Sequence, residues 1–562
     1  MTESRTIAQQ AHEHYQAGVP SEIPVPTTSL FELLEHSARV YPDHVAIDYF
    51  GKQWTYREFL GEALKAAAVL REAGVRKGDT VAFAMPNCPQ HFFAFYGAMR
   101  LGAAVAEHNP LAPAHQLAGQ IARHGGEVAV AWNQVAGKLT DSIAPNKILT
   151  VDLSAPLPWS MKAKLRLPVR AAREARKKLT GEGPSGSLSF DELVKKASPV
   201  ARRVPGATGA DRAVILHSSG TNGVPKSVPL THTNIGANVN QNLFWVWQLD
   251  RGGTTVFSLL PYFHAFGMCF MLCAVTGMAG TQIVLPTFDA DLALDAHLRE
   301  PVNFFVGVPP MFAKIAQRAT ERNIDISTIQ YAVSGGMSLS AEISQAWEDA
   351  TGGYIIEGYG MSETSPTISG SPMTPDRRHG CLGLPFPSTE LRIVDQDDPT
   401  KDLPEGEVGE LLIRGPQVFA GYLDAPEDNE QAFVEGGWFR SGDLCRSDDG
   451  FIYLVDRSKD LIITSGFNVY PSEVEEAILA LTSAKDAVVV GRPNPQCGEE
   501  VVAIITANWK KPDLQRLRRT LEERLPHYAL PRDLVMLDQI PRSLIGKPER
   551  ARVRTALIEG EI

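Results

Sequence analysis

The sequence predicts an α/β protein with a large N-terminal part of several subdomains and a small C-terminal α+β module. Its 562 residues exceed what one hydrophobic core usually organises. Apolar helices and strands alternate through the first half of the chain, which is typical of mostly parallel sheets covered by helices. Roughly the last hundred residues combine short predicted strands and helices in a pattern that differs from the rest of the chain, as expected for a separate compact module.

The first predicted elements follow a polar leader. A helix with regularly spaced apolar residues is expected at 29–40 and a strand at 45–49, after which Thr55 can cap the next helix. Residues 80–84 are expected to form a strand and 90–101 a helix that ends at a glycine. This alternation is the basis for the predicted parallel sheet.

Residues 159–178 differ in texture from their surroundings. They hold eight Lys or Arg side chains and a single acid, Glu174, with Leu165, Leu167 and Val169 between them. One interpretation is a basic amphipathic insertion that makes peripheral contact with an anionic membrane surface, at its inner face. The other is a solvated surface helix. The sequence leaves both open.

Residues 218–227 are expected to form a phosphate-binding loop. Glycines let backbone N–H groups crowd an anion, hydroxyls add donors, and Lys226 supplies a charge. A P-loop is excluded because Pro225 stands where that pattern needs its second glycine, and because extended segments flank the loop on both sides. A plain Gly/Ser surface turn is the alternative. The residues expected to contact phosphate are Ser218, Ser219, Gly220, Thr221, Asn222, Gly223 and Lys226.

After this loop, Thr231 or Thr233 can cap a helix that reaches residue 247. The apolar run 266–280 is too short and too rich in glycine for a comfortable membrane span and is expected to be a buried helix. Further strands are expected at 302–309, 331–333, 390–394 and 410–414, the last two half-exposed. The C-terminal module is expected to contain helices at 471–481 and 511–524, strands at 487–490 and 501–506, and a basic tail.

Composition narrows the possible partners and compartment. The net charge of −11 is spread along the chain and argues against nucleic acid as the main partner. The six cysteines lack paired metal-ligand spacing and are expected to be reduced and mostly buried. Residues 1–20 show no secretory signal, so the cytoplasm is the expected compartment. Oligomeric state is left open.

Several motifs follow one another in a fixed order: 218–227, 359–363, 437–443, 456–460, 466–473 and 541–547. From about residue 30 to the C-terminus they resemble the adenylate-forming superfamily of acyl-CoA ligases, adenylation domains and beetle luciferases. The resemblance implies an adenylation domain at 1–456, which binds the acid and ATP. It also implies a mobile C-terminal domain at 457–562, with its hinge near Lys459.

The resemblance also implies roles for individual residues, with ATP, Mg²⁺ and coenzyme A as cofactors. Glu363 would carry Mg²⁺ and Ser362 would donate to the α-phosphate. Lys547 would bridge the attacking carboxylate and the α-phosphate during transfer. Asp443 would accept the ribose hydroxyls, and Arg457 would assist at the ribose or phosphates.

Two further sets of residues are implied by the same resemblance. His264 would line the acyl channel, although a hydrogen-bonded core histidine is the alternative, and Gly466 would line the pantetheine tunnel. Asn222 and Ser227 depart from the family's usual loop pattern, so nucleotide affinity or selectivity is in doubt there. The residues implied beside the adenine are Gly335, Gly336 and Tyr359, and Gly360 is implied as a further nucleotide-binding residue.

The resemblance is strongest to bacterial medium- to long-chain fatty acyl-CoA ligases, so a fatty acid is the expected substrate. An aryl acid such as a cinnamate is the leading rival, because pocket depth decides between acids and the sequence does not show it. A fatty acyl-AMP ligase that hands its product to a carrier protein is a further alternative. A non-catalytic nucleotide-binding or membrane module is disfavoured because Glu363, Asp443 and Lys547 occur together, and a luciferase-like oxygenase would also need a luciferin-shaped pocket.

Overall fold

The computed structural model describes residues 5–201, 206–218, 226–464, 467–494, 497–507, 513–543 and 546–562. The chain divides into two compact units. Unit 1 comprises Met1–Gln10, Leu391–Ile413 and Val434–Ile562, and unit 2 comprises Ala11–Glu390 and Arg414–Phe433. The domain boundary expected between residues 456 and 457 separates a fixed part of the chain from a part that moves. It stays a prediction.

One of the sheets of unit 2 has seven strands in the order β7-β6-β5-β3-β4-β8-β9. All neighbouring pairs are parallel except β8 and β9, which form an antiparallel hairpin. This confirms the predicted, mostly parallel sheet. The strands are β3 (Thr80–Ala84), β4 (Ala104–Glu107), β5 (Val128–Trp132), β6 (Ile148–Val151), β7 (Leu188–Ser189), β8 (Arg212–Ser218) and β9 (Lys226–Thr231).

The second sheet of unit 2 has nine strands in the order β16-β15-β14-β13-β12-β10-β11-β1-β2. Its centre is parallel, and its apolar face packs on helices through large buried side chains such as Phe305, Phe312 and Trp347. The strands are β1 (Val45–Tyr49), β2 (Lys52–Thr55), β10 (Thr255–Ser258), β11 (Thr281–Val284), β12 (Phe304–Gly307), β13 (Tyr331–Gly335), β14 (Tyr354–Gly360), β15 (Thr367–Gly370) and β16 (Leu384–Pro385).

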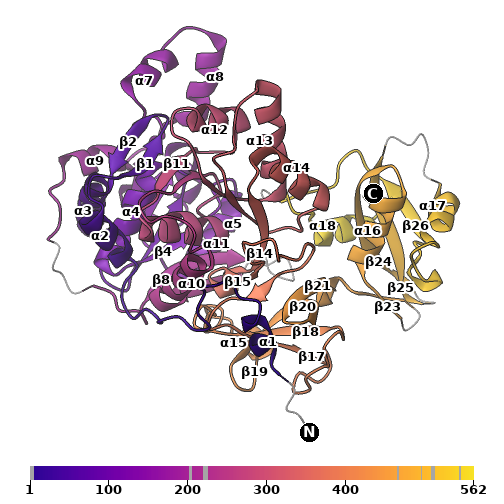
Figure 1. The fold of residues 1–562 in the computed structure, drawn as a ribbon. Coiled ribbons are helices and arrows are strands. Elements are labelled where there is room, and N and C mark those ends of the chain that lie inside the picture. The colour runs from indigo at the N-terminus through magenta and orange to yellow at the C-terminus, as the bar shows by residue number, and fades with distance from the viewer. Residues whose placement is uncertain are drawn as a thin grey trace. The chain divides into compact units, whose positions relative to one another are not determined.

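Helices surround both sheets of unit 2 (Figure 1). Thr55 and Thr231 each cap a helix, so Thr231 rather than Thr233 starts the helix after the loop. The helices are α2 (Phe31–Val40), α3 (Tyr56–Glu72), α4 (Pro89–Leu101), α5 (Ala114–His124), α6 (Asn133–Ala136), α7 (Trp159–Leu165), α8 (Arg170–Leu179), α9 (Phe190–Lys196), α10 (His232–Trp245), α11 (Ala265–Gly267), α12 (Ala290–His297), α13 (Pro309–Arg322), α14 (Ala341–Thr351) and α15 (Pro426–Ala432). Helix α1 (Ile7–His12) lies near the N-terminus.

The apolar run 266–280 is a buried helix, as expected, but most of it is the π-helix Met268–Val275. Among the residues that the structure describes, no helix is both long and apolar enough to cross a membrane. The strand expected at 302–309 is shorter than predicted. It covers only Phe304–Gly307, because Pro309 has the fixed backbone angle that suits the first turn of a helix and begins α13.

Unit 1 contains most of two further five-stranded sheets. The strand expected to be half-exposed at 410–414 is instead mostly buried, because Glu410 is buried in an ion pair with Arg440. The expected basic tail forms a helix, which buries Val553 and Leu557. The elements are β17 (Glu390–Val394), β18 (Gly409–Arg414), β19 (Phe433–Val434), β20 (Trp438–Asp448), β21 (Phe451–Arg457), β22 (Ile462–Thr464), β23 (Phe467–Val469), α16 (Pro471–Leu481), β24 (Ala484–Asn494), β25 (Gly498–Ala507), α17 (Leu514–Leu521), β26 (Asp533–Met536) and α18 (Arg550–Glu559).

Candidate active site

The phosphate-binding loop joins β8 to β9. In this antiparallel hairpin Ser218 pairs with Lys226 and His217 pairs with Ser227. A strand follows Lys226 directly, where a P-loop would open a helix, so the structure confirms the hairpin. The structure therefore describes the first and last predicted phosphate contacts, Ser218 and Lys226. The others, Ser219, Gly220, Thr221, Asn222 and Gly223, lie outside the described residues.

Lys226 is held by two residues that the sequence did not suggest. Its Nζ atom lies 2.7 Å from Oδ1 of Asp428, in the first turn of α15. The same ammonium lies 4.7 Å from the centre of the Tyr422 ring. An anion that binds Lys226 therefore competes with a carboxylate that is already there.

Glu363 connects to the same tyrosine. It lies in the short 3₁₀ turn η4 (Ser362–Thr364), where it is buried. The Tyr422 hydroxyl donates to Glu363 Oε1 at 3.0 Å. Burial, and then the charge of Glu363, raise the pKa of Tyr422, so the phenol stays a donor at neutral pH. Glu363, Tyr422 and Lys226 therefore form one cluster in unit 2.

The donor set of this cluster fits Mg²⁺. Mg²⁺ prefers oxygen ligands and is usually held by one or two carboxylates together with substrate phosphates. Glu363 offers such a carboxylate, buried and oriented by Tyr422. Lys226, at the end of the phosphate-binding loop, contacts that tyrosine as well. Glu363 is thus the residue that would hold the ion.

The residues expected beside the adenine lie together at the carboxyl ends of β13 and β14. These strands are parallel neighbours, with Gly335 paired to Gly358. Gly336 has φ +77°, and a Cβ on Gly360 would come within 1.9 Å of the Pro366 carbonyl oxygen. Tyr359 is half-buried between these glycines. Carboxyl ends of parallel strands are where α/β sheets usually bind ligands.

His264 lies near this group. Its Nδ1 accepts a hydrogen bond from the Phe266 N–H at 3.3 Å, which caps α11. The Phe266 ring in turn packs on Gly335, since a Cβ there would lie 3.0 Å from Phe266 Cζ. The segment expected to line the acyl channel therefore abuts the glycines expected beside the adenine, and the channel role of His264 stays a prediction. Gly466 lies outside the described residues.

Unit 1 holds the residues expected to contact the ribose. Asp443 on β20 faces Arg457 on β21, and Arg457 Nε lies 3.3 Å from Asp443 Oδ1. Asp443 is buried, directly after Gly442, whose φ of +70° turns the chain. The Asp443 N–H donates to Ser441 Oγ at 3.1 Å. A buried carboxylate fixed in this way suits an acceptor for two hydroxyl groups.

Lys547 belongs to the same group of charges. The pKa of Lys547 is lowered to about 8, first by burial and then by the positive charge of Arg457. The carboxylates of Asp443 and Asp460 act in the opposite direction, and Lys459 adds to the lowering. The backbone N–H of Lys547 donates to Ser543 Oγ at 3.2 Å. The structure thus brings Lys547, Asp443, Arg457 and Lys459 together within unit 1.

Comparison with known proteins supports one family. A "Long-chain-fatty-acid--CoA ligase" from Bacillus subtilis is 31% identical over 545 residues and covers 96% of both chains. A "4-coumarate--CoA ligase-like 9" from Oryza sativa is 28% identical, with 96% of this chain and 94% of that protein covered. The crystal structure of ATP-bound MatB from Rhodopseudomonas palustris matches with a TM-score of 0.80 and 26% identity, over 95% of this chain and 100% of that one.

Two family models match the chain directly. The model of the AMP-binding enzyme matches residues 34–423, and that of the AMP-binding enzyme C-terminal domain matches residues 473–547. The first covers more than half of the sequence, and the second includes Lys547. The chain therefore belongs to the AMP-binding enzyme family and, within it, to the AMP-forming acid–CoA ligases.

Proposed function

We propose that this enzyme joins a medium- to long-chain fatty acid to coenzyme A through an acyl-adenylate, releasing AMP and pyrophosphate. The observation that carries the proposal is the half-buried Lys547 beside Asp443 and Arg457, where burial and then the charge of Arg457 disfavour an unpaired ammonium group. Such a cation suits a reaction in which negative charge develops on oxygen. The similarity to a relative named as a long-chain fatty acid–CoA ligase supports the acid.

In the first half-reaction, a carboxylate oxygen of the acid attacks the α-phosphorus of ATP, and the bond to pyrophosphate breaks. Ser218 and Lys226 would hold the β- and γ-phosphates, and Ser362 would donate to the α-phosphate. Mg²⁺, bound through Glu363, would screen the triphosphate. Lys547 would stabilise the charge that develops on the transferring oxygens.

In the second half-reaction, the thiol of coenzyme A attacks the acyl carbonyl and AMP leaves. The proposal includes a rotation of residues 457–562 about Lys459 that withdraws Lys547 before the thiol arrives. The contacts on either side of Lys459 support this hinge. Arg457 is paired with Asp443 of β20, whereas Asp460 is paired with Arg550 of α18 at 2.9 Å. Only Ser458 and Lys459 lie between these two anchored points.

To test the function, purified protein is incubated with ATP, Mg²⁺, coenzyme A and one acid at a time. The acids range from acetate to palmitate and include cinnamate. We expect AMP and acyl-CoA from medium- and long-chain acids. Faster turnover of cinnamate than of any fatty acid would favour an aryl acid–CoA ligase. Acyl-AMP that accumulates without thioester would favour transfer to a carrier protein.

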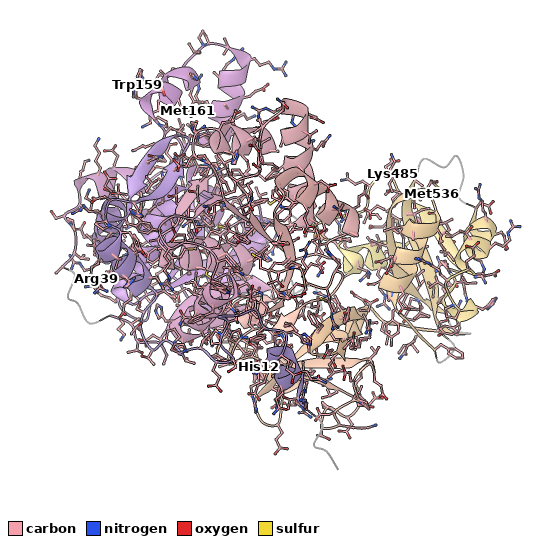
Figure 2. The ribbon with its side chains drawn as sticks, viewed as in Figure 1. His12, Arg39, Trp159, Met161, Lys485 and Met536 are labelled. Carbon is pink, nitrogen blue, oxygen red and sulfur yellow. The ribbon has the colours of Figure 1, made fainter. Side chains whose placement is uncertain are left out.

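The proposal extends to a peripheral contact with an anionic membrane. Helices α7 and α8 form a hairpin that projects at the top of Figure 1, and Figure 2 labels Trp159 and Met161 on α7. Trp159 is 83% exposed, and Leu167 and Val169 at the hairpin's tip are each 51% exposed. Residues 159–178 carry a net charge of +7 in a chain of −11. Exposed apolar side chains among cations fit a surface of anionic lipid headgroups.

Vesicle flotation tests this contact, with phosphatidylglycerol-containing vesicles compared with pure phosphatidylcholine vesicles. We expect binding to the anionic vesicles alone, weakened by salt. Replacing Arg173 and Arg176 with Gln should cost about 2 kcal/mol, or roughly 30-fold in binding, at about 1 kcal/mol per charge. The matched control replaces the exposed Arg516 and Arg519 of α17, and equal losses in the two variants would refute the assignment.

A further inference from the structure

Three histidines meet at the carboxyl end of the seven-stranded sheet, outside the site described above. His108 follows β4, His124 ends α5, and His217 is the penultimate residue of β8. One ligand nitrogen from each lies within 4.8 Å of the others.

The hydrogen bonds of the cluster define which nitrogens hold lone pairs. His108 Nδ1 lies 2.9 Å from the Ala106 carbonyl oxygen and 3.2 Å from that of Phe83. Because carbonyl oxygens only accept, Nδ1 carries the proton of His108, and its Nε2 has the lone pair. His124 Nδ1 accepts from the Gly126 N–H at 3.1 Å, so its Nε2–H donates to His108 Nε2, also at 3.1 Å.

His217 supplies the second lone pair. Its Nδ1 lies 3.3 Å from Ser227 Oγ across the hairpin. Its Nε2 is buried without a hydrogen-bond partner among the described residues. A buried orphan N–H is rarer than a buried orphan acceptor, which favours the tautomer with Nδ1–H bonded to Ser227 and the lone pair on Nε2. A metal-bound imidazole usually shows this arrangement, with its other nitrogen donating to an oxygen.

We propose that His108, His124 and His217 bind a Zn²⁺-type transition-metal ion. Imidazole nitrogen is a favoured ligand of such ions, and three histidines with a water molecule complete a tetrahedral set. The three ligand nitrogens lie no more than 4.8 Å apart, so an ion placed centrally among them would be within about 2.8 Å of each. Shifts of the side chains by less than about 1 Å would then bring the nitrogens to the usual Zn–N distance of about 2.0–2.1 Å. His124 must also move its proton from Nε2 to Nδ1, which breaks its bond with Gly126.

The electrostatics of the cluster act in both directions. Burial lowers the pKa of His108 to about 4, that of His124 to about 3 and that of His217 to about 2, so all three are neutral at physiological pH and protons do not compete with a metal. The charges of Arg212 and Arg123 contribute to the lowered pKa values of His124 and His217 and also repel a cation. We therefore expect an ion that chelators remove. It would tie the β4–α5 connection to the strand that enters the phosphate-binding loop.

Titration of the metal-depleted full chain with Co²⁺, without nucleotide, tests this site. We expect one Co²⁺ per chain, an intense visible band from four-coordinate Co²⁺, and displacement by Zn²⁺. A double variant, His108→Gln with His217→Gln, should bind at least tenfold more weakly. The matched control, His115→Gln, changes an exposed histidine of α5 and should bind as the wild type does. Glu363→Gln should also leave the band unchanged, which separates this site from the Mg²⁺ site.

Wild-type protein that binds Co²⁺ and Zn²⁺ no better than a folded double variant would refute the proposal. If the double variant does not fold, X-ray absorption of Zn²⁺ bound to the wild type decides. A shell of about three imidazole nitrogens supports the site, and an oxygen shell refutes it. These measurements do not depend on acid activation, so their outcome is independent of the proposed ligase function.

Discussion

The cluster of site residues in unit 2 and the cluster in unit 1 differ in how their charged side chains are surrounded. In unit 2 each charged group already has a specific partner: Lys226 contacts Asp428 at 2.7 Å, and Glu363 accepts from Tyr422 at 3.0 Å. In unit 1 Arg457 is likewise paired with Asp443, at 3.3 Å, but Lys547 is half-buried, and its burial, followed by the charge of Arg457, lowers its pKa to about 8. The carboxylates of Asp443 and Asp460 act in the opposite direction.

This difference bears on the role that each cluster plays in the reaction. A cation that is already neutralised binds an anion by exchanging one partner for another, so little affinity is gained. A half-buried cation with cationic neighbours gains more affinity for an anion. The anion offsets both the cost of desolvating the cation and the repulsion between the cations. We therefore expect the unit 2 cluster to position the triphosphate, and the unit 1 cluster to contribute most of the stabilisation of the transition state.

The largest expected effect is that of Lys547→Ala. Adenylation should fall about 10²–10³-fold, the usual cost of removing one group that stabilises developing oxyanion charge. Thioester formation from supplied acyl-AMP should be largely retained. Pyrophosphate release and acyl-CoA formation, measured separately, check the two halves. The control is Lys485→Ala, an exposed lysine of the same unit labelled in Figure 2. Equal losses in both halves would contradict the hinge proposal.

The pH dependence of adenylation should report the ionisation of the same lysine. Because Lys547 has a pKa of about 8, it loses its positive charge as the pH rises above that value. The kcat/KM of adenylation should then fall about tenfold per pH unit, since it reports ionisations of the free enzyme. Lys547→Arg should remove this decline, because arginine stays charged. A wild-type profile that stays flat well above this pKa would show that Lys547 is not the group responsible.

Tyr422→Phe should have an intermediate effect. It removes the hydroxyl that orients Glu363, and hydrogen bonds to charged groups contribute about 1.5–3 kcal/mol, so we expect a loss of roughly 10- to 150-fold. Because Tyr422 is a positioning residue, the Mg²⁺ concentration for half-maximal rate should rise, whereas KM for the fatty acid should not change. Tyr331→Phe, a half-buried tyrosine at the start of β13, is the control. An unchanged Mg²⁺ requirement would remove Tyr422 from the metal site.

The smallest effect should come from Asp428→Asn, which frees Lys226 from its carboxylate partner. KM for ATP should fall by up to about fivefold, since partly exposed ion pairs contribute about 0.2–1 kcal/mol. Steady-state kinetics at two salt concentrations check this, because screening should reduce the gain. Glu430→Gln removes the same charge from an exposed position on α15 and should change little. A rise in KM would mean that Asp428 helps to hold the nucleotide.

Much of the fold was predictable because its signals are local. Thr55 and the glycine after α4 mark helix ends within a few residues, and the predicted strands at 45–49 and 80–84 are confirmed. All six cysteines are free and buried, as expected. The two errors have different causes, one local and one from a residue 30 positions away. Pro309 was assigned to a strand but starts a helix, and the strand around Glu410 is buried because Arg440 neutralises it.

The sequence by itself determined the hairpin form of the phosphate-binding loop, through Pro225, and the family, through the order of its motifs. Only the tertiary structure showed that Tyr422 contacts Glu363 across 59 residues, that Asp428 holds Lys226, and that three histidines from separate elements meet. The physical reason is that a motif or a turn is encoded by neighbouring residues. A side chain's partners and pKa depend instead on which distant elements the fold packs beside it.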